Sequence, residues 1–93
     1  MTGKERAALR SQANRLDTIQ QIGKNGITDE LIKNVDAALK ARELIKLRVL
    51  ESAPLSAREA AAALADATSA DVIQVIGYRF VLWRKNTEDG ENP

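Results

Sequence analysis

The sequence has 93 residues, 44% of them hydrophobic, which is enough for one small domain with one modest core. It contains no cysteine and no histidine, which excludes disulfides, thiolate zinc sites and the commonest general base of enzymes. The formal net charge is +1, but three of the 13 acids follow Lys85, so residues 1–85 hold 14 bases against 10 acids, a net charge of +4. This excess favours a polyanionic partner without identifying one.

The sequence shows no membrane or enzyme signal. No apolar run approaches the roughly 20 residues that span a bilayer, and the N-terminus holds no apolar signal core. We therefore expect a cytoplasmic protein with no membrane contact. The acids are scattered along helical faces, with no cluster at metal-ligand spacing and no nucleophile motif. We expect a protein that is not an enzyme, with no metal, cofactor or small-molecule substrate.

The N-terminal segment predicts a helix. Thr2-Gly3-Lys4-Glu5 fits a capping box, and the helix should run to about Asn14. A thin apolar stripe lies at helical spacing: Leu9, Ala13 and Leu16. Arg6 and Arg10 belong to a basic face, which is either solvated or in contact with a nucleic-acid backbone.

The middle of the chain predicts a strand, a helix and a second strand. The first strand spans Thr18–Ile22, and the helix runs from Thr28 to about Ala41. Glu43–Leu50 is the second strand, with Ile45, Leu47 and Val49 on one face. Lys46 and Arg48 project from the opposite face, where they either meet solvent or contact a partner.

A G-x-x-G loop in residues 21–28 joins the first strand to the second helix. Because glycine has no Cβ, Gly23 and Gly26 can take positive φ and let the backbone of another molecule come close. The helix start would offer N–H groups to a sugar-phosphate backbone, but two acids in its first turn oppose a phosphate there. We therefore expect Lys24, held with Asn25 between the glycines, to carry the attraction. An ordinary strand-to-helix turn is the alternative.

The last part of the domain predicts a helix and a hairpin. Ser56-Ala57-Arg58-Glu59 is a second capping box, and its helix should run to about Thr68. The strands Val72–Ile76 and Phe80–Arg84 follow, joined by Gly77-Tyr78-Arg79 in a tight hairpin. Polar residues then predict a flexible acidic tail over residues 86–93, after a domain of residues 1–85.

The predicted order is α-β-α-β-α-β-β, an α/β (α+β) two-layer sandwich with a four-stranded mixed sheet. Two strand-helix-strand units should give parallel neighbours, and the hairpin should be antiparallel. Two helices should cover one face of the sheet, and the N-terminal helix or a partner should cover part of the other.

The three aromatic residues, Tyr78, Phe80 and Trp83, all fall in the final hairpin. Phe80 and Trp83 have opposite parity along the strand, so they point to opposite faces, and we expect one of them in the core. A base-stacking platform needs aromatic rings exposed on one face. Packing is therefore the default role of these rings, and base stacking by Trp83 or Tyr78 is the alternative. Recognition should rely mainly on phosphates and RNA shape.

With these segments in view, the chain resembles a bacterial single-domain member of the CRM family (chloroplast RNA splicing and ribosome maturation), of the YhbY type. The similarity covers nearly the whole chain, and its order makes it much stronger than a lone G-x-x-G. It rests on these segments: Thr2–Arg6, Leu9-Arg10, Gln21–Thr28, Ala41–Lys46, Gln74–Gly77 and Phe80–Leu82. Thr18 and Ser69 depart from the family pattern, which has proline and glycine there, and a left-handed Ser69 would cost about 1 kcal/mol.

The resemblance implies an RNA-binding module whose fold is similar to the C-terminal domain of bacterial initiation factor three. It also implies that the G-x-x-G loop contacts RNA, and that the partner is precursor ribosomal RNA or a precursor particle of the large (50S) subunit. A monomer is favoured, although the sequence leaves the oligomeric state open. The candidate RNA contacts are the loop residues and the basic residues that flank them: Gly23, Lys24, Asn25, Gly26, Arg6, Arg10, Lys33, Lys46 and Arg48. The alternative is a protein-interaction module that binds a ribosomal protein, or itself, through the sheet.

Overall fold

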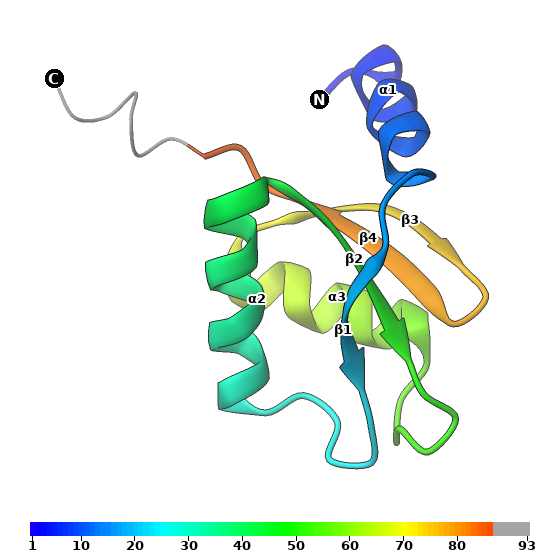
Figure 1. Ribbon diagram of the computed structural model, residues 1–93, viewed down its shortest axis with the longest axis vertical. Coiled ribbons are helices and arrows are strands. Elements are labelled where there is room, and N and C mark those ends of the chain that lie inside the picture. The colour runs from blue at the N-terminus through cyan, green and yellow to red at the C-terminus, as the bar shows by residue number, and fades with distance from the viewer. Residues whose placement is uncertain (87–93) are drawn as a thin grey trace, which may run out of the picture.

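The computed structural model describes residues 1–86, which form three helices and four strands (Figure 1). In chain order they are α1 (Gly3–Ala13), β1 (Thr18–Ile22), α2 (Asp29–Arg42), β2 (Leu44–Val49), α3 (Ala57–Thr68), β3 (Asp71–Ile76) and β4 (Arg79–Trp83). This order and the mixed sheet confirm the predicted fold class. Within the described part of the chain, no helix has the length and apolarity to cross a membrane.

Local capping signals start each helix where the sequence predicts. Thr2 and Ser56 form complete capping boxes with Glu5 and Glu59, and Thr28 caps α2 by accepting the Leu31 N–H at 3.0 Å. Hydrogen bonds from the cap backbone N–H groups lower the pKa of both glutamates. These contacts satisfy backbone donors that a helix start otherwise leaves free.

The strand order in the sheet is β1-β2-β4-β3. β1 and β2 are parallel, as predicted, and β4 is antiparallel to both of its neighbours. The expectation that the second strand-helix-strand unit also gives parallel neighbours is wrong, because β4 lies between β2 and β3. Phe80, Val81 and Leu82 of β4 are all buried, because helices pack on both faces of this central strand: Phe80 and Leu82 face the cluster of α2 and α3, and Val81 faces α1.

Two apolar clusters lie on opposite faces of the sheet. The larger cluster joins α2 and α3 to the sheet around Leu39, Leu64 and Phe80. The smaller one places Ala13 of α1 against Leu44, Ile73 and Val81, with Trp83 packed beside them. Phe80 and Trp83 therefore point to opposite faces, as their parity predicts, and α1 covers part of the second face (Figure 1).

The residues that end α2 and α3 both have positive φ, and only the second is in the left-handed helical region. Ser69 ends α3 with φ 58° and ψ 39°, the strained conformation considered for this position. Glu43 ends α2 with φ 65°, and its side chain accepts the Asn86 N–H at 2.7 Å. Asn86 also donates from Nδ2 to Lys40 O at 2.8 Å. The rest of the predicted acidic tail, residues 87–93, lies outside the described residues.

Candidate nucleic-acid interface

The G-x-x-G loop is a closed turn with an exposed tip. The Gly26 N–H donates to Gly23 O at 3.0 Å, which places Lys24 and Asn25 at the two central positions of a four-residue turn. Both side chains are exposed. A large partner can therefore reach the tip, and the lysine charge is available to it.

The two glycines differ in how far the fold itself requires them. Gly26 is buried with φ +65°, and a Cβ there would lie 3.1 Å from Pro54 Cγ. Gly23 is not among the positive-φ residues, and the nearest atom to an added Cβ would be Leu50 Cδ1 at 3.8 Å, an ordinary contact. The expectation of positive φ is thus right for Gly26 and wrong for Gly23. Backbone conformation and packing explain why position 26 is glycine, but they do not explain why position 23 is glycine.

The start of α2 is poorly suited to bind a phosphate by itself. Thr28 already caps the helix, and Asp29 and Glu30 stand in its first turn, where their charges repel an anion. A polar hollow of about 160 Å³ lies beside the loop and is lined in part by Gln21, Asn25 and Asn34. Sequence reasoning missed Gln21 and Asn34. Asn34 follows Glu30 by one helical turn, a spacing that could have placed it on the loop side of α2.

Four exposed residues form a row across all four strands. The ladder sets Gln21 of β1 beside Arg48 of β2, Arg48 opposite Arg79 of β4, and Arg79 opposite Ile76 of β3. Register partners point to the same face of a sheet, and here it is the face away from α2 and α3, since Ile22, Leu47 and Val49 point into that core. We call Gln21, Arg48, Arg79 and Ile76 the arginine row. Within residues 1–86, neither arginine is in an ion pair.

Helix α1 confines this exposed surface to one end of the sheet. At the other end Leu44 and Trp83 pack under α1, and Lys46 lies half-buried between the two zones, opposite Val81. Sequence reasoning missed Arg79 because it assigned this residue to the hairpin turn. In the structure the turn is Gly77-Tyr78, and Arg79 begins β4. Arg79 precedes Val81 by two residues, and this spacing could have placed both side chains on the same face of the strand.

The remaining predicted contacts are spread over the molecule. Arg6 donates from its guanidinium to Val72 O at 2.6 Å, which ties α1 to β3. Arg10 is exposed on α1 and Lys33 is exposed on α2. Helix α1 and the loop between β1 and α2 lie at opposite ends of the molecule (Figure 1). Gln21, at the start of the loop, pairs with Arg48 in the sheet, so the structure brings the loop close to Arg48. It separates the loop from Arg6 and Arg10.

Within residues 1–86, no three acidic side chains gather closely enough to hold a metal ion. The candidate surface consists of an exposed lysine at the loop tip, two sheet arginines that are in no ion pair within residues 1–86, and polar amides between them. Its chemistry suits a polyanion with hydroxyl and carbonyl groups along its length.

Comparison with protein families decides where the chain belongs, because a family model described as the CRS1 / YhbY (CRM) domain matches residues 1–84. The chain belongs to the CRM family. A Bacillus subtilis relative, named a probable RNA-binding protein, is 39% identical over 89 residues, covering 96% of this chain and 93% of its own. A Methanocaldococcus jannaschii protein of the same description is 40% identical over 86 residues, covering 90% of this chain and 63% of its own.

The solved structures agree with this CRM assignment. The solution structure of a Staphylococcus aureus protein, described as a candidate RNA-binding protein, aligns with a TM-score of 0.79 and 43% identity. The alignment covers 96% of this chain and 93% of the other. The fold and the family are therefore those that the resemblance indicated.

Proposed function

We propose that this CRM protein binds RNA through the tip of the G-x-x-G loop and the arginine row. Lys24 and Asn25 would contact phosphate or 2′-hydroxyl groups, and the side-chain-free Gly23 would let the RNA backbone approach. Arg48, Arg79 and Lys46 would hold the backbone along the sheet. Family membership and the names of the relatives support RNA as the partner.

The pairing of Arg48 with Arg79 is the observation that carries this proposal. Like charges directly opposite each other in a ladder destabilise a sheet, and no ion pair within residues 1–86 relieves these two. A fold that keeps such a pair exposed gains from a partner with closely spaced negative charges. Consecutive phosphates of one RNA strand have this character, and Arg presents a planar donor fork that fits them.

The biological target in this proposal is precursor ribosomal RNA of the large subunit, and the protein acts there as a non-enzymatic binder. This part rests on the CRM family resemblance. One observation favours a second candidate, a protein-interaction module: Ile76 and Tyr78 are 63% and 54% exposed beside the arginines. In the RNA reading these side chains support a ribose or a base. In the other reading they form the centre of a protein interface.

Salt dependence separates the two candidates. Binding of a labelled large-subunit precursor RNA is followed by fluorescence anisotropy at several salt concentrations. Each phosphate contact adds a slope of about −0.7 to −0.9 in log K against log salt. Arg79→Gln should reduce the slope by about one contact. The matched control, Lys40→Gln, removes the same charge from the surface of α2, where the ammonium pairs with Asp36 at 3.6 Å, and should leave the slope unchanged. Equal effects of the two variants would contradict the proposed interface.

A further inference from the structure

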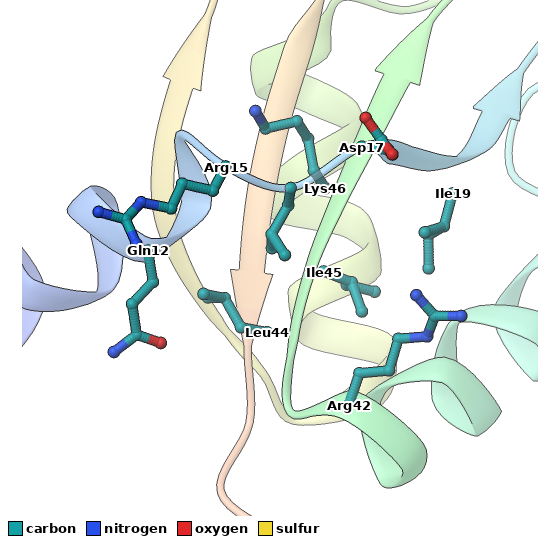
Figure 2. A pocket seen from close by; sticks show the side chains of 9 residues that line it. Gln12, Arg15, Asp17, Ile19, Arg42, Leu44, Ile45 and Lys46 are labelled. Carbon is teal, nitrogen blue, oxygen red and sulfur yellow. The ribbon is translucent and has the colours of Figure 1, made fainter.

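A cavity of about 490 Å³ lies between the end of α1, the start of β1 and the start of β2, and the proposed function does not use it (Figure 2). It exists because β1 begins to pair with β2 only at Thr18 and Lys46. Leu44 and Ile45 of β2 therefore have no β1 residue beside them, and the chain instead leaves the sheet edge toward α1. The volume falls within the roughly 300–1,000 Å³ of small-ligand pockets.

The floor and one wall of this cavity are apolar. Leu44 and Ile45 line it from the start of β2, with their side chains on opposite faces of that strand, and Ile19 stands at its side (Figure 2). Ile19 is 38% exposed, one of few large apolar side chains open to solvent within residues 1–86. No aromatic residue lines the cavity. A flat apolar group placed here would cover Ile19, which otherwise meets water, and this is favourable. Leu44 and Ile45 are already buried, so Ile19 supplies most of the apolar contact.

The rim of the cavity is cationic. Arg15, Arg42 and Lys46 line it against a single acid, Asp17, and none of the three bases is in an ion pair within residues 1–86. Arg42 stands in the last turn of α2, where a cation is also favourable for the helix dipole. In Figure 2 the Arg42 guanidinium reaches toward Ile19. The interaction with the helix dipole does not require this side-chain orientation.

We propose that the cavity holds one unpaired nucleotide of the bound RNA. The base lies against Ile19 and Leu44, and Arg15 and Arg42 hold the flanking phosphates or stack on the base through a guanidinium plane. The apolar lining of the cavity suits the flat base of a nucleotide, and the cationic rim suits its phosphate. A paired base is stacked within its duplex and cannot enter, so the cavity selects RNA with a bulge or an open loop. This inference rests on the proposed function.

The test uses two RNA hairpins of the same stem and loop, one with a single bulged nucleotide and one without it. The bulged nucleotide carries the fluorescent base 2-aminopurine in place of adenine. The full chain should bind the bulged hairpin about tenfold more tightly, because the base covers apolar surface at Ile19 and its phosphate gains a contact with Arg42. Binding should also shield the 2-aminopurine from acrylamide quenching. Ile19→Ser and Arg42→Gln should each remove the preference and the shielding. Arg79→Gln should weaken both hairpins alike and keep the preference.

Each other outcome overturns a defined part of the proposal. Equal affinity of the wild-type protein for the two hairpins, with no shielding, refutes the nucleotide site and leaves the proposed RNA-binding function intact. A preference that survives in both cavity variants, with circular dichroism unchanged, places the base elsewhere. Failure to bind either hairpin or the precursor RNA, together with salt-insensitive binding of a protein partner, refutes the proposed function itself.

Discussion

Arg48 of β2 and Arg79 of β4 stand directly opposite each other in the antiparallel ladder. The neighbouring Val49 N–H donates to Tyr78 O at 2.7 Å, so Val49 and Tyr78 form a hydrogen-bonded pair. Pairs alternate along an antiparallel ladder. Arg48 and Arg79 are therefore a non-hydrogen-bonded pair, the kind whose side chains lie closest together.

Reversing one charge of this pair should stabilise the fold. Arg79→Glu turns a repulsive cross-strand pair into an attractive one, so the free energy of unfolding should rise by about 0.5 kcal/mol. Arg48→Glu should act similarly, and the double variant should lose the gain because two acids repel again. Urea unfolding of the four proteins measures this coupling. RNA affinity should fall in every variant; a destabilised single variant would show that the two side chains diverge.

The two loop glycines should respond differently to alanine. Gly26→Ala forces a side chain into left-handed backbone and against Pro54, which should lower the free energy of unfolding by about 1–2 kcal/mol. Gly23→Ala meets only an ordinary contact with Leu50 and should change stability by less than about 0.5 kcal/mol. We expect Gly23→Ala to weaken RNA binding all the same. Full affinity of this variant would remove Gly23 from the interface.

Reversal of charge at the loop tip tests the loop as a contact. The double variant Lys24→Asp with Asn25→Asp keeps both glycines and changes two exposed side chains, so its circular dichroism and unfolding midpoint should match the wild type. Binding to precursor RNA should fall about tenfold or more because one phosphate contact is replaced by repulsion. Unchanged RNA affinity with an intact fold would mean that the loop is not the contact.

The ion pair between Asp36 and Arg84 should make stability depend on pH. Arg84 donates to Asp36 Oδ1 at 2.7 Å, and this hydrogen bond lowers the pKa of the Asp36 carboxyl. A lowered pKa adds stability that is complete above the unfolded-state pKa and is lost as the pH falls through the folded-state value. Asp36→Asn should therefore cost about 1 kcal/mol at neutral pH, a modest value because the carboxylate is 39% exposed.

The same variant should begin to approach the wild type in stability as the pH falls below about 3.9, the unfolded-state pKa of an aspartate, and should match it once the pH is below the lowered pKa of folded Asp36. Denaturant unfolding at a series of pH values measures both curves. Lys40→Gln is the control, since its ammonium lies 3.6 Å from Asp36 at an exposed site and should matter little. A constant difference between Asp36→Asn and wild type at all pH values would exclude the ionised pair as its cause.

Ser69 offers a stabilising substitution outside the interface. Its left-handed backbone at the end of α3 costs a non-glycine residue about 1 kcal/mol, so Ser69→Gly should raise the free energy of unfolding by up to that amount. Ser69→Ala keeps a Cβ and should bring no gain. Thermal unfolding of both variants checks the difference, and equal midpoints would show that the serine is not strained.

Local signals made much of the fold predictable. The capping boxes at Thr2 and Ser56 fixed two helix starts, because each depends on residues three positions apart. The parity of Phe80 and Trp83 placed one ring on each face of the sheet, because side chains alternate along any strand. The G-x-x-G spacing likewise placed Lys24 and Asn25 at an exposed tip.

The strand order was not available from local signals, and it decides the candidate site. Parity alone puts Arg48 and Arg79 on one face, but only the insertion of β4 between β2 and β3 sets them side by side. The late start of β1, which opens the cavity beside Ile19, is also a matter of register between distant segments. The sequence by itself determined the elements, their caps and their buried faces. Tertiary structure decided which charges became neighbours, because strand pairing joins residues that no short-range pattern connects.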